Sequence, residues 1–197
     1  MKTDIKEFIK SQLLESAEVK NQTINTCSES VSKAVELISG SFLNRGKLLI
    51  CGNGGSAADA QHLAAELVIR LSHNIKRPGL AAISLSTDCS IMTAGGNDIG
   101  FENVFARQVE ALAHPEDVLL VISTSGNSHN ILRALDMAKE KEVKTIGFLG
   151  GSGGKCAAKV DIAITVPSTN TQRIQETHIT LGHILIELVE RELFVTN

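Results

Sequence analysis

The side chains best suited to chemistry in this sequence are histidines and glutamates spaced by helical turns. His62 and Glu66 stand four residues apart, so on a helix they share one face about one turn apart. Gln175 and His183 lie in a strongly apolar C-terminal segment with helical spacing. Imidazole nitrogens, carboxylate oxygens and an amide oxygen are ordinary ligands of Zn²⁺. A simple hydrogen bond on a solvated face would explain His62 and Glu66 taken alone, and the second segment shifts the balance toward a metal site.

The spacing within the C-terminal segment limits which of its side chains can act together. Gln175 and His183 are eight residues apart, roughly 12 Å along a helix. One ion could take both only if the side chains lean together or a second subunit supplies one, and we favour a composite intersubunit site. His178 is rotated by about 140° from His183, so we expect it to face elsewhere. The remaining histidines are expected to be solvated: His73, His114 and His129.

A second feature is the hydroxyl-rich segment Ser123-Thr124-Ser125-Gly126-Asn127-Ser128, which opens an expected helix. Free backbone N–H groups and the positive end of the helix dipole suit such a place to a phosphate group. Capping of the helix by Ser and Asn is the alternative explanation. Four hydroxyls and a glycine within six residues exceed what a cap needs, so the segment indicates a phosphate site.

The glycine-rich segment Gly52-Asn53-Gly54-Gly55 does not match a nucleotide motif. G-x-G-x-x-G fails because Ala57 stands three residues after Gly54, and no Gly-Lys-Ser/Thr follows. The glycines indicate instead a tight turn that something approaches closely.

Short apolar runs predict the elements that position these residues. Continuous rather than alternating apolar runs are typical of strands covered on both faces in a parallel sheet. The runs are 48–51, 80–85, 118–122, 145–149 and 162–166. We therefore predict an α/β fold with a doubly wound, five-stranded parallel sheet over residues 46–197, ending in a long helix from about Thr171 to Leu193. Residues 1–45 are expected to form a two-helix arm with a break near 21–23, closing near Gly40, whose apolar stripes pack on the domain or on another subunit.

Composition excludes several classes of protein. The chain has 197 residues, a net charge of −3, no Trp or Tyr and six Phe. These features argue against nucleic-acid binding, and no apolar run approaches the ~20 residues that a spanning helix needs. The first nine residues lack the apolar core of a secretory signal, so a cytoplasmic location is expected. Reduced thiols are expected because no CxxC spacing joins the four cysteines: Cys27, Cys51, Cys89 and Cys156.

Four motifs together resemble the signature of the bacterial phosphoheptose isomerases of the sugar isomerase (SIS) superfamily. They are Cys51–His62 with Glu66, Gly96-Asn97-Asp98, Ile122–Ser128, and Arg173–His178 continuing to His183. The likeness covers nearly the whole chain. It implies a flavodoxin-like sheet, a homotetramer with active sites between subunits, and one Zn²⁺ per subunit.

The resemblance also implies an activity, the conversion of D-sedoheptulose 7-phosphate to D-glycero-D-manno-heptose 7-phosphate through a cis-enediol. This is the first step toward nucleotide-activated heptose for lipopolysaccharide or other surface glycans. Glu66 would be the base and His183 the acid. The implied zinc ligands are His62, Glu66, Gln175 and His183. The implied substrate contacts are Asn53, Gly54, Gly55, Glu66, Asn97, Asp98, Ser123, Thr124, Ser125, Ser128 and Gln175.

Three other functions share this scaffold. One relative in the superfamily binds a replication initiator protein, but its positions corresponding to Glu66 and His183 are not an acid–base pair. Sugar-phosphate-sensing regulators usually carry a DNA-binding domain, for which this chain has no room. Another aldose–ketose isomerase, or a zinc-free one, would differ only in substrate length or metal. The presence of both Glu66 and His183 favours catalysis.

Overall fold

The computed structural model describes residues 4–195 and contains one five-stranded sheet. Every neighbouring pair of strands is parallel, and the strand order is β2-β1-β3-β4-β5. The strands are β1 Leu48–Gly52, β2 Ala82–Ser84, β3 Val118–Ser123, β4 Lys144–Gly150 and β5 Ile162–Val166. All residues of β1 and β3 are buried, as their continuous apolar runs predict. The predicted flavodoxin-like doubly wound sheet is confirmed, and its order reverses between β1 and β3.

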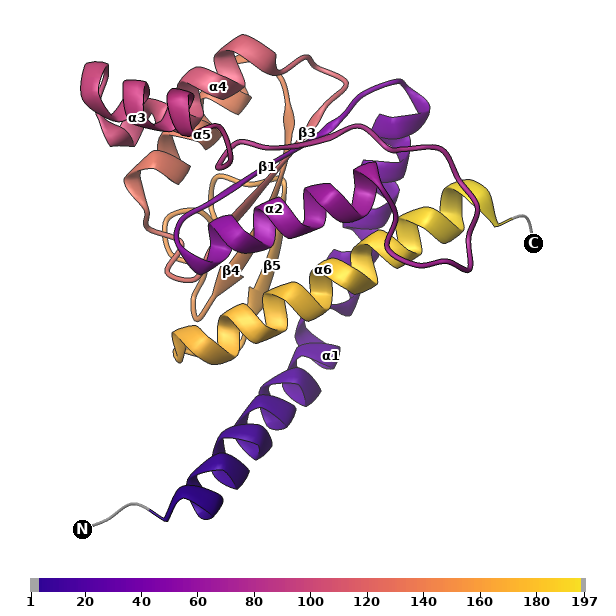
Figure 1. The fold of residues 1–197 in the computed structure, drawn as a ribbon, viewed down its shortest axis with the longest axis vertical. Coiled ribbons are helices and arrows are strands. Elements are labelled where there is room, and N and C mark those ends of the chain that lie inside the picture. The colour runs from indigo at the N-terminus through magenta and orange to yellow at the C-terminus, as the bar shows by residue number, and fades with distance from the viewer. Residues whose placement is uncertain (1–3, 196–197) are drawn as a thin grey trace.

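Helices cover both faces of this sheet. The helices are α1 Ile5–Leu43, α2 Gly55–Val68, α3 Cys89–Asp98, α4 Val104–Leu112, α5 His129–Glu140 and α6 Thr171–Phe194, with a 3-10 turn at Phe101–Asn103. Alternate residues of β1 divide between two cores: Ile50 packs with α1, α2 and α6, whereas Leu49 packs with α4 and α5. Figure 1 shows α2 and α6 lying together on one side and α3 to α5 on the other.

The arm differs from the prediction, because α1 is one continuous helix of 39 residues. The expected break near 21–23 was wrong. No Gly or Pro occurs between Ile5 and Ser39, and the Thr23 hydroxyl donates back to the carbonyl of Val19 at 2.7 Å without interrupting the helix. The change in apolar pattern marks instead where the helix meets the domain, since Val19 is its first buried residue. The end near Gly40 was also wrong, because the helix continues to Leu43.

The long C-terminal helix is confirmed at Thr171–Phe194. Asn170 caps its start by accepting a hydrogen bond from the backbone N–H of Gln172. Among residues 4–195, no helix is long and apolar enough to cross a membrane.

Candidate active site

His62 and Glu66 on α2 meet His183 on α6 where the two helices pass each other. A Cβ at Gly182 would come within 2.6 Å of the Leu63 side chain, so the glycine permits this close approach of the two helices. Gly182 immediately precedes His183 on α6, and Leu63 immediately follows His62 on α2. The packing therefore brings together two histidines separated by 121 residues.

His62, Glu66 and His183 form a compact group. The Nε2 atoms of His62 and His183 are 2.8 Å apart, and His62 Nε2 lies 3.4 Å from Glu66 Oε1. One ligand atom from each of the three side chains lies within 4.8 Å of the others. The His62 side chain is 46% exposed and that of Glu66 19%. Two nitrogens and a carboxylate oxygen converging on one open place fit the donor set of a zinc ion.

Gln175, the fourth expected ligand, lies two turns before His183 on α6. Its amide packs against the start of α2, where a Cβ at Gly55 would lie only 2.6 Å from Gln175 Nε2. The glycine-rich segment was expected to be approached closely by another group, and the Gln175 amide of the same chain is one such group. Gly54 adopts a φ of +57°, a conformation that glycine takes without strain.

The hydroxyl-rich loop Ser123–Ser128, called the phosphate-type loop from here on, is held in shape by its own hydrogen bonds. Gly126 N–H donates to the hydroxyl of Ser123 at 3.2 Å, and Asn127 N–H donates to that of Ser125 at 3.2 Å. Gly126 has a φ of +61°, and a Cβ there would collide with the carbonyl oxygen of Gly153. Ser128 is the N-cap residue of α5, yet within residues 4–195 its side chain makes no capping hydrogen bond. Capping therefore does not account for this hydroxyl.

Asn130, which the sequence analysis missed, joins the two loops. Asn53 and Asn130 exchange two amide hydrogen bonds of 2.9 Å each, and Asn130 is only 3% exposed. This pair fixes the glycine-rich loop after β1 to the start of α5. A polar residue at the second position of an expected helix was the available signal, but its partner lies 77 residues away.

Asn97 and Asp98 occupy the end of α3 and are exposed. The Asn97 amide donates to the Asp98 carboxylate at 2.7 Å. Within the described residues, neither side chain hydrogen-bonds to the His–Glu–His group or to the phosphate-type loop. Within residues 4–195, the only side-chain hydrogen bond of Asn97 and Asp98 is the one that joins them.

Two titratable groups on α2 and α6, the half-buried Asp59 and the buried His178, have shifted pKa values. Burial raises the pKa of Asp59 to about 6, against the opposing effect of His62, and its Oδ2 has no hydrogen-bond partner within residues 4–195. His178 donates from Nε2 to the carbonyl of Leu149 at 2.9 Å, and burial lowers its pKa to about 4. His178 faces the sheet, as the rotation along α6 predicted. The other histidines are exposed, also as predicted: His73, His114 and His129.

Comparison with known proteins shows which family this chain is similar to. A family model described as the SIS domain matches residues 13–150. The phosphoheptose isomerase of Geotalea daltonii is 53% identical over 188 residues, which are 95% of this chain and 97% of that protein. The solved phosphoheptose isomerase of Neisseria gonorrhoeae is 42% identical with a TM-score of 0.88, covering 94% of this chain and 98% of that one. That of Francisella tularensis is 38% identical with a TM-score of 0.91, covering 96% and 100%.

The fold and the matched residues thus define a SIS domain. The resemblance between the motifs and a narrower group is confirmed by the identities over nearly the whole chain. The chain belongs to the phosphoheptose isomerase family.

Proposed function

We propose that the chain isomerises D-sedoheptulose 7-phosphate to D-glycero-D-manno-heptose 7-phosphate. The observation that carries this proposal is the pairing of Glu66 on α2 with His183 on α6, their ligating atoms within 4.8 Å of each other. Ketose–aldose conversion needs a base for the carbon-bound proton and an acid for the neighbouring oxygens. This site supplies one of each.

The proton transfers follow from these two groups. Glu66 takes a proton from C1 of the ketose, and the electron pair forms the C1–C2 double bond of a cis-enediol as the C2 carbonyl oxygen gains a proton. Glu66 returns its proton to C2, while the hydroxyl on C1 loses its proton and becomes the aldehyde. His183 serves the two oxygens. Atoms and charge balance without an oxidant or a reductant.

His62, Glu66, Gln175 and His183 would hold one Zn²⁺ per subunit. When bound, the ion supplies Lewis-acid polarisation of substrate oxygens. The donor set fits, since three of the four side chains already converge. Because ligation and proton transfer both use the lone pairs of Glu66 and His183, the two roles must alternate or divide between atoms of the same side chain.

The loop after β3 anchors the phosphate in this proposal. Its four hydroxyl side chains belong to Ser123, Thr124, Ser125 and Ser128, and they stand at the N-terminus of α5. The loop after β1 would contact the sugar through Asn53, Gly54 and Gly55, along with Gln175. Binding energy gained at the phosphate, away from the reacting carbons, orients C1 and C2 toward Glu66.

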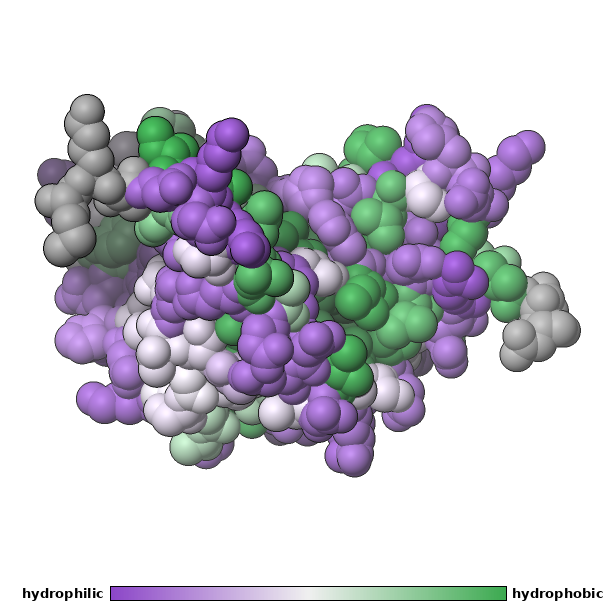
Figure 2. Space-filling view, turned by 90° about the horizontal axis from the view of Figure 1, so that it is seen from below, coloured by the Kyte–Doolittle hydropathy of each residue, from purple (hydrophilic) through white to green (hydrophobic). Residues whose placement is uncertain are grey.

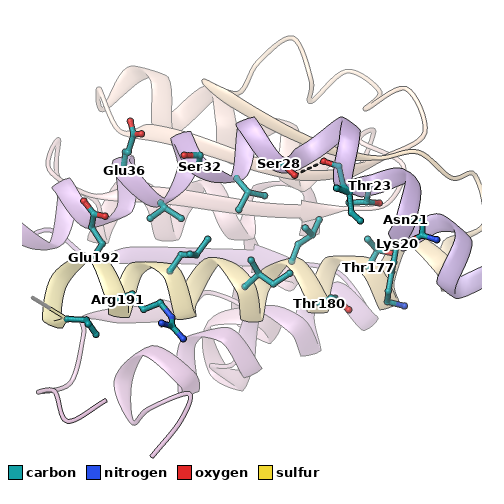
Figure 3. Close-up of a pocket in the computed structure, with 17 residues that line it drawn as sticks. Lys20, Asn21, Thr23, Ser28, Ser32, Glu36, Thr177, Thr180, Arg191 and Glu192 are labelled. Carbon is teal, nitrogen blue, oxygen red and sulfur yellow. Dashed lines mark hydrogen bonds between the residues drawn. The ribbon is translucent and has the colours of Figure 1, made fainter. Parts of the chain in front are cut away.

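In this proposal Asn97 and Asp98 also contact the substrate, and the surface of the chain supports assembly with a second subunit. A groove of about 860 Å³ runs between α1 and α6, with the exposed apolar residues Ile24, Ile184 and Leu188 among its lining (Figure 3). The N-terminal part of α1, before its first buried residue Val19, exposes further apolar side chains, including Phe8 and Leu13. Figure 2 shows apolar residues gathered on the face seen from below. Such a surface is typical of a subunit interface, and the proposed assembly is a homotetramer with active sites between subunits.

The proposed setting is the cytoplasm, where the heptose phosphate would begin the route to nucleotide-activated heptose for lipopolysaccharide or another surface glycan. The function is tested by incubating purified protein with sedoheptulose 7-phosphate and following the aldose by proton NMR. The assay is repeated after chelation and after adding zinc back. Formation of the heptose aldose, lost on chelation and restored by zinc, is expected. Turnover that survives thorough chelation would contradict a role for zinc. No turnover under any condition would contradict the proposed isomerase activity.

A further inference from the structure

Arg77 is a buried arginine in the loop between α2 and β2, and its guanidinium group hydrogen-bonds to residues of α2, of α6 and of its own loop. Its side chain is 1% exposed. Its NH2 group donates to the backbone carbonyl of Glu66 at 2.8 Å. Its NH1 group donates to the carbonyls of Leu67 at 2.8 Å and Pro78 at 2.9 Å. One planar guanidinium group thus closes the last turn of α2.

This placement has an electrostatic reason. The final carbonyls of a helix have no partner within the helix, and they carry the negative end of its dipole. A cation that donates to two of them satisfies both requirements. One of the two carbonyls belongs to Glu66, the residue that carries the proposed base, so Arg77 holds the backbone from which that carboxylate projects.

The other end of the contact is on α6. Arg77 Nε donates to Glu190 Oε1 at 2.6 Å, and the Glu190 side chain is also 1% exposed. Glu190 follows His183 by seven residues, close to two full turns, so both side chains lie on the same face of α6. The same Oε1 accepts the backbone N–H of Leu71 at 3.4 Å. Glu190 Oε2 has no partner within residues 4–195.

We propose that Arg77 and Glu190 are positioning residues that set the approach of Glu66 on α2 to His183 on α6. The pair joins the backbone of one helix to a side chain of the other, close to where the two helices present the base and the acid. This inference rests on the proposed isomerase function. A purely structural pair would contribute to stability alone, whereas a positioning pair also controls the geometry of the His–Glu–His group.

Arg77→Lys is the variant that separates the two roles. Lysine keeps the positive charge for Glu190 but lacks the planar fork that reaches the carbonyls of Glu66 and Leu67 together. Glu190→Gln is the milder second variant, since its amide oxygen can still accept from Arg77. Lys47→Met is the matched control. Lys47, just before β1, forms an ion pair with the buried Asp117, just before β3, and within residues 4–195 neither side chain hydrogen-bonds to α2 or α6.

Each metal-loaded variant is compared with the wild type for kcat and KM on sedoheptulose 7-phosphate and for its thermal midpoint. The affinity of the metal-free protein for zinc is measured without substrate. We expect Arg77→Lys to lower kcat by about 10- to 100-fold, with KM within about twofold, because small displacements of reacting groups are costly. Its zinc affinity should fall about tenfold. Glu190→Gln should show the same pattern at about threefold, and Lys47→Met should lower only the thermal midpoint.

The proposal is overturned if a folded Arg77→Lys protein keeps kcat and zinc affinity within twofold of the wild type. It is also overturned if KM rises while kcat is unchanged. Should Arg77→Lys fail to fold, Glu190→Gln decides by the same two criteria. An inactive wild type would instead remove the proposed function, and the zinc affinities would then decide the positioning claim separately.

Discussion

Two regions that carry expected substrate residues differ sharply in how the chain builds them. The loops after β1 and β3 are tied together by the paired amides of Asn53 and Asn130, and α2 and α6 meet at Gly182. By contrast, none of the ten described residues of α3 is buried. Asn97 and Asp98 at its end hydrogen-bond to each other, and within residues 4–195 neither side chain bonds to the two loops or to the His–Glu–His group.

This contrast between the tied loops and α3 indicates which part of the site is formed within one chain. The His–Glu–His group and the loop Ser123–Ser128 are formed within one chain, so we expect that loop to bind phosphate without a second subunit. Within the described residues the α3 region has no such ties, and we propose that a neighbouring surface completes it. Under the proposed function, that surface is another subunit.

The largest effect is expected from Glu66→Gln, which removes the base from the preformed region. The variant is nearly isosteric, so the fold and phosphate binding should persist while kcat falls about 10³-fold. Kinetics on sedoheptulose 7-phosphate and calorimetric titration with inorganic phosphate measure the two properties. Turnover close to the wild type would remove Glu66 as the base.

Leu188→Arg tests the proposed subunit interface at the groove between α1 and α6. Leu188 is 40% exposed and lines the groove between α1 and α6, so a charge there should be tolerated by one chain and opposed by an interface. We expect a smaller assembly by light scattering, about 100-fold lower turnover and unchanged phosphate binding. Glu140→Arg, on the exposed end of α5, is the control. Full activity in a dissociated Leu188→Arg protein would contradict the proposal that the active site needs a second subunit.

His178 offers a test of how the preformed region depends on pH. Its pKa falls from about 6.5 unfolded to about 4 folded, so below pH 6.5 the unfolded state binds the proton first and stability declines as pH falls. The loss between pH 7 and 5 is about 2 kcal/mol. Urea unfolding at both pH values should show His178→Gln losing less than the wild type by about this amount. Equal losses would show that His178 is not buried as a neutral ring. Asp59, with its raised pKa, acts in the opposite direction and cancels in the difference.

A smaller effect is expected at the glycine-rich loop. Gly55→Ala places a methyl group against the Gln175 amide, so we expect kcat to fall about tenfold with the fold retained. Gly40→Ala is the matched control, since no described atom lies within 4 Å of its added Cβ. It should stabilise α1 by about 0.5–1 kcal/mol and leave turnover unchanged. Equal activities in the two variants would show that Gln175 adapts freely.

Features with local causes could be predicted from the sequence. Continuous apolar runs located the strands, and the rotation between His178 and His183 separated a buried ring from one at the site. The continuity of α1 was missed because a change of burial resembles a break. Asn130 and Arg77 were missed because their roles exist only through partners distant in sequence, Asn53 and Glu190. No local pattern records such contacts.

The most direct test of the account is isomerisation in D₂O by the zinc-loaded protein. If Glu66 carries the proton between C1 and C2 through an enediol, the proton on the base exchanges with solvent, and the heptose aldose should carry deuterium at C2. Proton NMR of the product reads this position directly. Deuterium at C2 in the wild type, with neither product nor exchange in Glu66→Gln, is the predicted result. An aldose that forms with no deuterium at C2, in the wild type and at the same rate in Glu66→Gln, would contradict the role given to Glu66.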